Sequence, residues 1–219
     1  LAISSAASDV YKRQDYELES VNFDHPLWVL FSSGTTGKPK AITHSTGGIL
    51  LEQYKSLSLH QNIVSGDRFF WNTTTGWMMW NYAIGSFLCG AVLCLYDGSA
   101  NFPDIGVQWR FAKEAKINHF GNGSPLFIAS MKQDIDDVND KDLRFIKTIG
   151  ATGSPLSVEA FKWLQKKLPK AQIISLSGGT DVCSAFIGGC SKLPVYAGFL
   201  QCNMLGASIQ AWDENGKNI

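Results

Sequence analysis

The chain has 219 residues with 19 basic and 19 acidic side chains, so its formal net charge at pH 7 is zero. This balance argues against a nucleic acid or an anionic membrane as partner, because both attract broad basic surfaces. Any anion must therefore be bound locally, and we expect small-molecule partners. Hydrophobic residues make up 45% of the chain and charged residues 17%, which is typical of a folded protein with one large or two small domains.

Strands and helices are predicted to alternate along most of the chain. We expect strands at 27–31, 67–71, 91–96, 117–120, 145–149, 172–176 and 207–212, the first of them buried. Helices are expected at 48–59, 77–89, 105–116, 124–132 and 158–168. Gly90 ends the second helix, Ser157 caps the last, and Asn215-Gly216 predicts a hairpin turn. Such alternation predicts an α/β fold with a largely parallel sheet and flanking helices.

The chain shows no convincing membrane span and no metal-binding cysteine pattern. Its most apolar stretch, residues 82–96, is too short to cross a bilayer and is interrupted by two glycines. Five cysteines lack Cys-x-x-Cys spacing, which is typical of free thiols, and we expect a cytoplasmic protein without a structural zinc site. We interpret residues 1–14 as a non-native or disordered leader and residues 15–219 as the folded unit.

Three loops rich in Gly, Ser and Thr follow predicted strands. The first comprises Ser32, Ser33, Gly34, Thr35, Thr36, Gly37, Lys38, Pro39 and Lys40; the second includes Gly153, Ser154 and Pro155; the third comprises Ser177, Gly178, Gly179, Thr180 and Asp181. Glycines let a backbone approach a ligand closely, and successive N–H groups beside lysines suit a polyphosphate. Ligands bind beyond the carboxyl ends of parallel strands, so the three loops are predicted to surround one nucleotide.

The first loop does not have the spacing of a Walker A motif. That motif needs four residues between its first glycine and the Gly-Lys pair, and Ser or Thr after the lysine. Here Gly34 and Gly37 are separated by only two residues, and Pro39 follows Lys38. A P-loop kinase or GTPase is therefore disfavoured.

The three loops instead resemble those of the adenylate-forming enzymes, a superfamily that includes the acyl-CoA synthetases. The resemblance implies that Gly153, Ser154 and Pro155 lie against adenine, and that Lys38 and Lys40 hold the β- and γ-phosphates. It further implies that Thr180 contacts the α-phosphate and that Asp181 holds Mg²⁺. Two residues depart from the superfamily pattern, because Ser177 replaces an aromatic residue and Asp181 replaces a glutamate.

A fourth motif narrows the resemblance to one subfamily. The motif includes Gly76, Trp77, Met78 and Trp80, in the region that shapes the acyl pocket of the superfamily, and its bulky side chains predict a small acid. Together with the three loops and with residues 95–99 and 193–198, it resembles the acetoacetate–CoA ligases, in which both departures are usual. The resemblance covers His25 to the C-terminus and implies part of the large N-terminal domain of an adenylate-forming enzyme.

The activity implied by this resemblance is a two-step ligation. ATP and acetoacetate give an acyl-adenylate and pyrophosphate, and coenzyme A then displaces AMP, with Mg²⁺ as the metal. The ribose-binding aspartate, the hinge and the adenylation lysine of the family have no match here, so we expect a fragment without the C-terminal lid domain and with weak or no ligase activity.

Other interpretations of the same residues remain open. The motif could belong to an acetyl- or propionyl-CoA synthetase, or to a nucleotide-binding module without catalysis. Trp77 and Trp80 lie three residues apart and could be ordinary packing on one helix face. His44 could approach the nucleotide or make a helix-entry hydrogen bond, whereas His119 is predicted to be a hydrogen-bonded core histidine.

Overall fold

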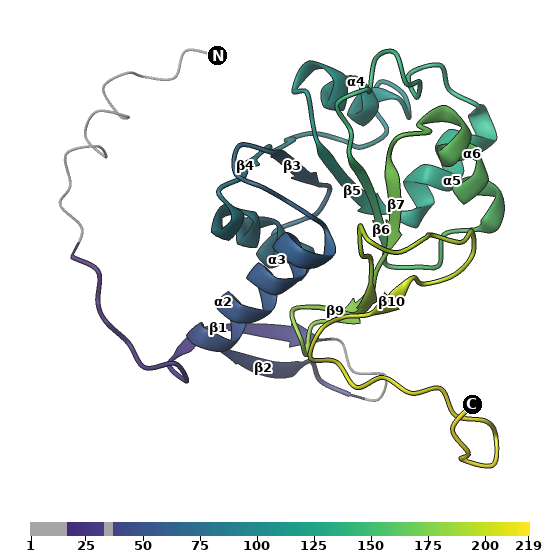
Figure 1. Cartoon of the computed structure of the whole chain (residues 1–219). Coiled ribbons are helices and arrows are strands. Elements are labelled where there is room, and N and C mark those ends of the chain that lie inside the picture. Colours follow the sequence, from purple (N-terminus) through teal and green to yellow (C-terminus); the bar gives the residue numbers. More distant parts are fainter. Residues whose placement is uncertain (1–16, 33–36) are drawn as a thin grey trace.

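The computed structural model describes residues 17–32 and 37–219, and it is organised around a five-stranded parallel sheet (Figure 1). The strand order is β4-β3-β5-β6-β7. These strands are β3 (Arg68–Trp71), β4 (Val92–Leu93), β5 (His119–Gly123), β6 (Thr148–Thr152) and β7 (Gln172–Ser175). The parallel sheet and its flanking helices confirm the predicted α/β fold.

Two smaller antiparallel sheets adjoin the central one. The first pairs β1 (Pro26–Ser32) with β2 (Lys40–Ser45), and the second has the order β10-β9-β8. Its strands are β8 (Ser177–Gly179), β9 (Ser184–Gly188) and β10 (Cys202–Asn203). The first small sheet contains the two ends of the first predicted loop, and the second contains part of the third loop. The small sheets therefore bring these loops close to the main sheet.

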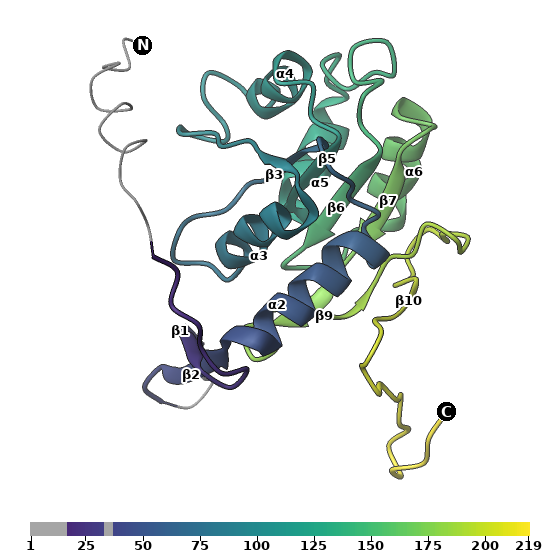
Figure 2. The ribbon, with the colours of Figure 1, turned by 60° about the vertical axis from the view of Figure 1, so that its left-hand side comes forward.

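Helices cover both faces of the central sheet (Figures 1 and 2). On one face lie α4 (Val107–Glu114), α5 (Ser124–Gln133) and α6 (Val158–Lys167). On the other lie α2 (Thr46–Tyr54), which continues into the π-helix η1 (Lys55–His60), and α3 (Met79–Gly85), which continues into the 3₁₀-helix η2 (Ser86–Cys89). Within the described residues, no helix is both long and apolar enough to cross a bilayer.

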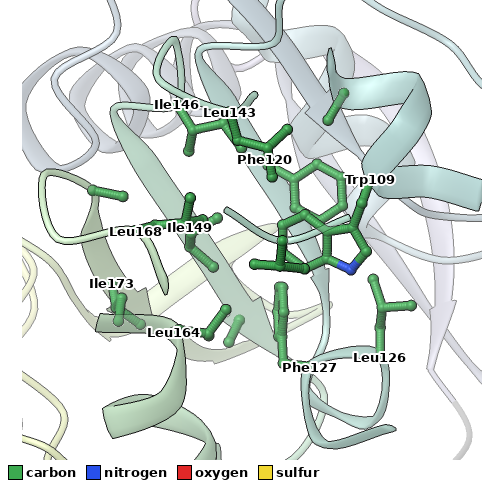
Figure 3. Close-up of a cluster of buried hydrophobic side chains, with 14 of the residues drawn as sticks. Trp109, Phe120, Leu126, Phe127, Leu143, Ile146, Ile149, Leu164, Leu168 and Ile173 are labelled. Carbon is green, nitrogen blue, oxygen red and sulfur yellow. The ribbon is translucent and has the colours of Figure 1, made fainter. Parts of the chain in front are cut away.

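Alternating side chains of β3 and β7 supply two separate cores. Ile173 of β7 packs into the core beneath α4, α5 and α6, whereas its neighbour Ile174 packs into the core beneath α2 and α3. Successive side chains of a strand point to opposite faces, so a continuous apolar strand serves both cores. Figure 3 shows the first core, in which Trp109 and Phe120 stack with ring centroids 4.5 Å apart.

Most predicted helices and several of their boundaries are confirmed. Ser157 accepts a hydrogen bond from the backbone N–H of Ala160 at 3.2 Å and so caps α6. Gly90 ends η2 with φ of 70°, a conformation that glycine adopts without strain. The helix predicted at 48–59 is present as α2 and η1, although its apolar residues Leu50 and Tyr54 are exposed.

The strand predicted at 27–31 is present as β1, but the prediction that it is buried is wrong. β1 pairs only with β2, outside the central sheet, and Leu27, Val29 and Phe31 are exposed. The alternate residues Trp28 and Leu30 pack against the second core. One face of the β1–β2 ribbon therefore packs against the second core, and the other face is exposed to solvent. An unbroken run of apolar residues does not reveal that only one face is buried.

The C-terminal prediction is partly wrong. Residues 207–212 form no regular strand, although a single antiparallel bridge joins Trp212 to Asn218. The predicted hairpin turn between them is present, since Asp213 N–H donates to the carbonyl of Lys217 at 2.8 Å and Gly216 has φ of 74°. The expected strand at 91–96 shortens to the two residues of β4, while β2, β8, β9 and β10 were not predicted.

A buried polar network joins the starts of β3, β5 and β6. His119 is 1% exposed, its Nε2 lies 2.8 Å from Asp67 Oδ2, and its Nδ1 lies 2.8 Å from Thr148 Oγ1. Lys147 Nζ reaches the other oxygen of Asp67 at 2.6 Å. A neutral imidazole fits these partners, because Nε2–H can donate to the carboxylate while Nδ1 accepts from the threonine hydroxyl. The prediction of a satisfied core histidine is confirmed.

The two ionisable groups of this network have shifted pKa values. Burial lowers the pKa of His119 below 6.5, although the hydrogen bond to Asp67 opposes that shift. Burial raises the pKa of Asp67, but the hydrogen bonds from Lys147 and His119 outweigh it, so the pKa falls below 3.8. The carboxylate is therefore charged and the imidazole neutral at pH 7.

We predict that the protein loses stability as the pH falls through 6.5, the unperturbed pKa of histidine. Below that pH the unfolded chain binds a proton that folded His119 resists, so unfolding is favoured. The Asp67 contribution is retained in this window and is lost only below pH 3.8. Urea unfolding of wild type and His119→Gln at about pH 7.5 and about pH 5 measures this, and the variant should lose less stability between the two. An equal loss in both proteins would contradict the assignment.

Candidate functional site

The loops that follow β6 and β7 meet at the carboxyl edge of the central sheet. β6 and β7 are parallel neighbours, with Ala151 opposite Ser175. Gly153, Ser154 and Pro155 of the second predicted loop and Ser177 and Gly178 of the third line one cavity of about 320 Å³. We call this cavity the outer cavity. The prediction that these two loops converge is confirmed.

A segment that sequence reasoning did not place in the site completes the outer cavity. Gly198, Phe199 and Leu200 line it opposite the two loops. Residues 193–198 resembled the ligase subfamily, but no strand end or loop pattern indicated their position. Ser177, which stands where the superfamily has an aromatic residue, lines the cavity, and the aromatic side chain that lines it is that of Phe199.

A smaller cavity lies directly behind the outer one. Its volume is about 120 Å³, and it shares Gly153 and Gly178 with the outer cavity. Trp77, Met78 and Thr180 line its other sides. We call it the inner cavity. Because two glycines are common to both cavities, a ligand in one lies next to a ligand in the other.

The described ends of the first loop lie beside the third loop. Ser32 pairs with Lys40 across the β1–β2 ribbon, and Ser33, Gly34, Thr35 and Thr36 lie outside the described residues. Ser32 and Pro39 line a cavity of about 490 Å³ together with Gly76, Trp77 and Thr180. This front cavity shares Trp77 and Thr180 with the inner one.

Two contacts join the β1–β2 ribbon to Asp181. Lys40 Nζ lies 3.7 Å from Asp181 Oδ1, with both side chains mostly exposed. His44 Nε2 lies 3.1 Å from the Asp181 carbonyl oxygen, and its ring is buried. His44 lies on β2, so the predicted hydrogen bond at a helix entry is wrong; the ring instead bonds the third loop. The exposed ion pair contributes little stability but places one cation beside one carboxylate.

The predicted site residues that the structure describes thus fall into three groups. Around the three connected cavities lie Ser32, Gly76, Trp77, Met78, Gly153, Ser154, Pro155, Ser177, Gly178, Gly179 and Thr180. Lys40 and Asp181 pair at their rim, and Gly37 and Lys38 are exposed near it. Trp80 lines none of the three, because it faces a separate cleft.

That separate cleft has a volume of about 950 Å³ and lies on the far side of Trp77. We call it the wide cleft. Trp80 and Trp77 line it together with the ends of β3 and β5. The two tryptophans therefore share one cleft, as three-residue spacing suggests, but only Trp77 also reaches the inner cavity.

Three side-chain amides form a hydrogen-bonded ring, and two of them, those of Asn72 and Asn122, line the wide cleft. Gln108 Nε2 donates to Asn72 Oδ1 at 2.9 Å, Asn72 Nδ2 to Asn122 Oδ1 at 3.4 Å, and Asn122 Nδ2 to Gln108 Oε1 at 2.7 Å. Sequence reasoning missed these residues. The only available signal was that Asn72 and Asn122 lie at the carboxyl ends of β3 and β5, where ligands bind in parallel sheets.

The site offers one carboxylate for a cation. Among residues 17–32 and 37–219, no group of three His, Cys, Asp or Glu side chains is close enough to hold a metal by itself. Mg²⁺ commonly keeps several waters and uses one or two carboxylates plus substrate phosphates. Asp181, exposed and next to Thr180, fits that requirement.

Comparison with known proteins assigns the chain to a family. Residues 2–213 match the family described as AMP-binding enzyme. Because the match covers nearly the whole chain, the chain belongs to the AMP-binding enzyme family, and the predicted superfamily is confirmed.

Several relatives are acetoacetyl-CoA synthetases. The chain is 41% identical to that of Rhizobium meliloti (strain 1021) over 202 residues and 40% identical to that of Mus musculus over 204 residues. A solved acetoacetyl-CoA synthetase from Streptomyces lividans superposes with a TM-score of 0.88 at 46% identity, covering 96% of this chain and 34% of that one. The mouse alignment covers 93% of this chain but only 30% of the mouse protein, so the chain spans about a third of the length of these relatives.

We predict that Gly178→Ala disrupts the site whereas Gly179→Ala does not. A Cβ at position 178 would overlap the carbonyl oxygen of Ser184 in the paired strand β9, where the backbone cannot move aside. A Cβ at position 179 would meet no atom within 4 Å. Urea unfolding should show a loss of about 1–3 kcal/mol for the first variant and under about 0.5 kcal/mol for the second. Equal stabilities would contradict the close approach of β8 to β9.

Proposed function

We propose that the chain supplies the ATP site of an adenylate-forming acid–thiol ligase that activates acetoacetate to acetoacetyl-CoA. The observation that carries the proposal is the continuity of the three cavities through Gly153, Gly178, Trp77 and Thr180. Family membership and the named relatives support the same activity. ATP, coenzyme A and a short acid are the proposed substrates, with Mg²⁺ as the metal.

The nucleotide is proposed to extend from the outer cavity to the front cavity. Adenine would lie between Ser154 and Gly178, where glycine and small side chains leave room for a flat ring. The α-phosphate would then reach the hydroxyl of Thr180, which borders both the inner and the front cavities. The β- and γ-phosphates would meet Lys38 and Lys40 at the ends of the first loop.

The local charges suit this placement. Lys40 and Asp181 provide one cation and one carboxylate within 3.7 Å of each other. The lysine can neutralise a phosphate, and the carboxylate, as the one acidic group of the third loop, would hold a cation that supplies further positive charge to the phosphates. The zero net charge of the chain requires such local recognition.

The chemistry asks for positioning and charge neutralisation. A carboxylate is a poor electrophile, and attack on the α-phosphorus converts it to an acyl-adenylate with AMP as a good leaving group. Such a transfer needs in-line placement of the acid and the α-phosphate, without a covalent nucleophile on the protein. The Thr180 hydroxyl and Lys40 would hold the phosphates, and Mg²⁺ at Asp181 would neutralise charge on the departing pyrophosphate.

The inner cavity is proposed to take the acid. Its volume of about 120 Å³ is well below the roughly 300–1,000 Å³ typical of sites for drug-sized ligands, so it suits a short chain. Trp77 and Met78 close it on the side of α3. An acetyl- or propionyl-CoA synthetase would use the same cavity for a shorter acid, and a module without catalysis would bind only the nucleotide.

We predict that Lys40→Ala weakens binding of ATP·Mg²⁺ by about tenfold or more, because a charge-assisted phosphate contact is lost. Isothermal titration of the wild type and the variant measures the change. Lys162→Ala removes an exposed lysine on α6 and should bind like wild type. Absence of ATP binding by the wild-type chain, or an equal loss in both variants, would refute the nucleotide site.

We predict that Trp77→Ala broadens the range of acids whereas Trp80→Ala does not. Only Trp77 lines the inner cavity, so its removal lengthens the space beside Thr180. Acid-dependent exchange between ATP and pyrophosphate tests the assignment of the acid to the inner cavity. It is measured with acetate, acetoacetate and hexanoate on an enzyme that contains the residues of this chain. A shift toward hexanoate in Trp80→Ala alone would place the acid in the wide cleft instead.

A further inference from the structure

Two short segments far apart in sequence meet at four points. The first segment runs from Lys40 through β2 and α2 to Tyr54, and we call it the β2–α2 segment. The second runs from Thr180 to Ser184, and we call it the 180–184 turn. Besides the two contacts to Asp181, Gln53 Nε2 donates to Cys183 Sγ at 3.6 Å, and Ser184 Oγ donates to Glu52. Asp181, Cys183 and Ser184 of the turn therefore all contact the same β2–α2 segment.

The 180–184 turn contains a strained backbone. Cys183 has φ of 52° and is fully buried. Its N–H donates to the carbonyl oxygens of Gly179 and Thr180, at 3.1 and 3.2 Å, which closes a tight turn around Asp181. A residue with a Cβ is rarely found in this left-handed region, and it persists there only where its surroundings hold it.

Gln53 is placed to stabilise the strained conformation of Cys183. Its side chain is 2% exposed, and its amide oxygen fills the space that a Cβ on Gly85 of α3 would need. Burial raises the pKa of Cys183 to about 11, so the sulfur that accepts the hydrogen bond is a neutral thiol at pH 7. The amide is thus confined between α3 and the turn, with one uncharged partner.

Glu52 anchors the end of the turn in a similar way. Lys55 Nζ lies 2.7 Å from Glu52 Oε2 and donates to the carbonyl of Leu205 at 2.8 Å. The carboxylate that receives the Ser184 hydroxyl is therefore itself held by a cation one turn along the helix. Charge-assisted partners of this kind restrict a side chain more than neutral ones do.

We propose that Glu52 and Gln53 are positioning residues that hold the 180–184 turn in its strained conformation. Through them, the β2–α2 segment, which begins at the first loop, sets where Thr180 and Asp181 lie. The β2–α2 segment and the 180–184 turn would then bind the two ends of a polyphosphate as one connected structure. The effect on the ligand rests on the proposed function, whereas the effect on the turn does not.

The first test reads the turn without any ligand. Gln53→Met keeps the length of the side chain and removes its donor, without burying a charge. Iodoacetamide alkylation followed by mass spectrometry resolves each of the five cysteines, and the rate at Cys183 reports how often the turn opens. We expect about a tenfold faster reaction at Cys183 in the variant, as for the loss of one buried hydrogen bond.

Gln172→Leu is the matched control. It removes the hydrogen bonds from another glutamine, at the amino-terminal end of β7, to the carbonyl of Cys190 and to Gln201, and should leave the Cys183 rate unchanged. Unchanged alkylation of Cys183 in Gln53→Met, or an equal increase in both variants, overturns the proposal.

The second test is a double-mutant cycle on ATP·Mg²⁺ affinity. Cys183→Gly relieves the backbone strain, since glycine adopts positive φ freely, so the turn no longer needs Gln53. We expect Gln53→Met to weaken ATP·Mg²⁺ binding about tenfold in the wild-type background and less than about twofold in the Cys183→Gly background. Equal losses in the two backgrounds would show that Gln53 acts on general stability and would overturn the proposal.

The two tests separate the inference from the proposed function. If the wild type binds no ATP·Mg²⁺ but Gln53→Met still opens Cys183, the proposed function fails and the hold on the turn stands. If ATP·Mg²⁺ binds and Gln53→Met changes neither Cys183 alkylation nor affinity, the nucleotide site stands and the positioning role fails.

Discussion

Parallel pairing of β6 with β7 places two glycine-rich loops at the same sheet edge, and the rest of the site depends on that arrangement. The outer and inner cavities share Gly153 and Gly178, so they exist only while the two strands keep their register. Gly178 also lies against the β9 backbone, where any side chain would overlap it. The third loop is thereby held from both sides, by the central sheet and by a small antiparallel sheet.

Much of this arrangement could be predicted from the sequence. The predicted alternation of strands and helices indicated the parallel sheet. Loops that follow parallel strands must emerge at the same edge of that sheet. Burial of β1 could not be predicted, because an apolar run does not reveal whether a strand joins the main sheet or a separate ribbon. The separate roles of Trp77 and Trp80 were equally hidden, since both side chains line the wide cleft and only one also turns to the inner cavity.

Long-range contacts explain what the sequence did not indicate. Nothing in the sequence around Cys183 indicates its positive φ. That conformation accompanies a contact with Gln53, 130 residues away in the chain, whose amide donates to the Cys183 sulfur. The amide ring of Asn72, Gln108 and Asn122 likewise joins three elements that local patterns treat separately. Both sets of contacts arise from the packing of α2 and α4 on the sheet.

Amide hydrogen exchange with and without ATP·Mg²⁺, resolved by segment, most directly tests the proposal that the three loops share one nucleotide site. If one ATP spans the connected cavities, exchange should slow together in residues 37–45, 152–157 and 177–184, while the remote start of β7 is unaffected. Protection confined to one of these segments, or centred on the wide cleft, would contradict a single site built from all three loops.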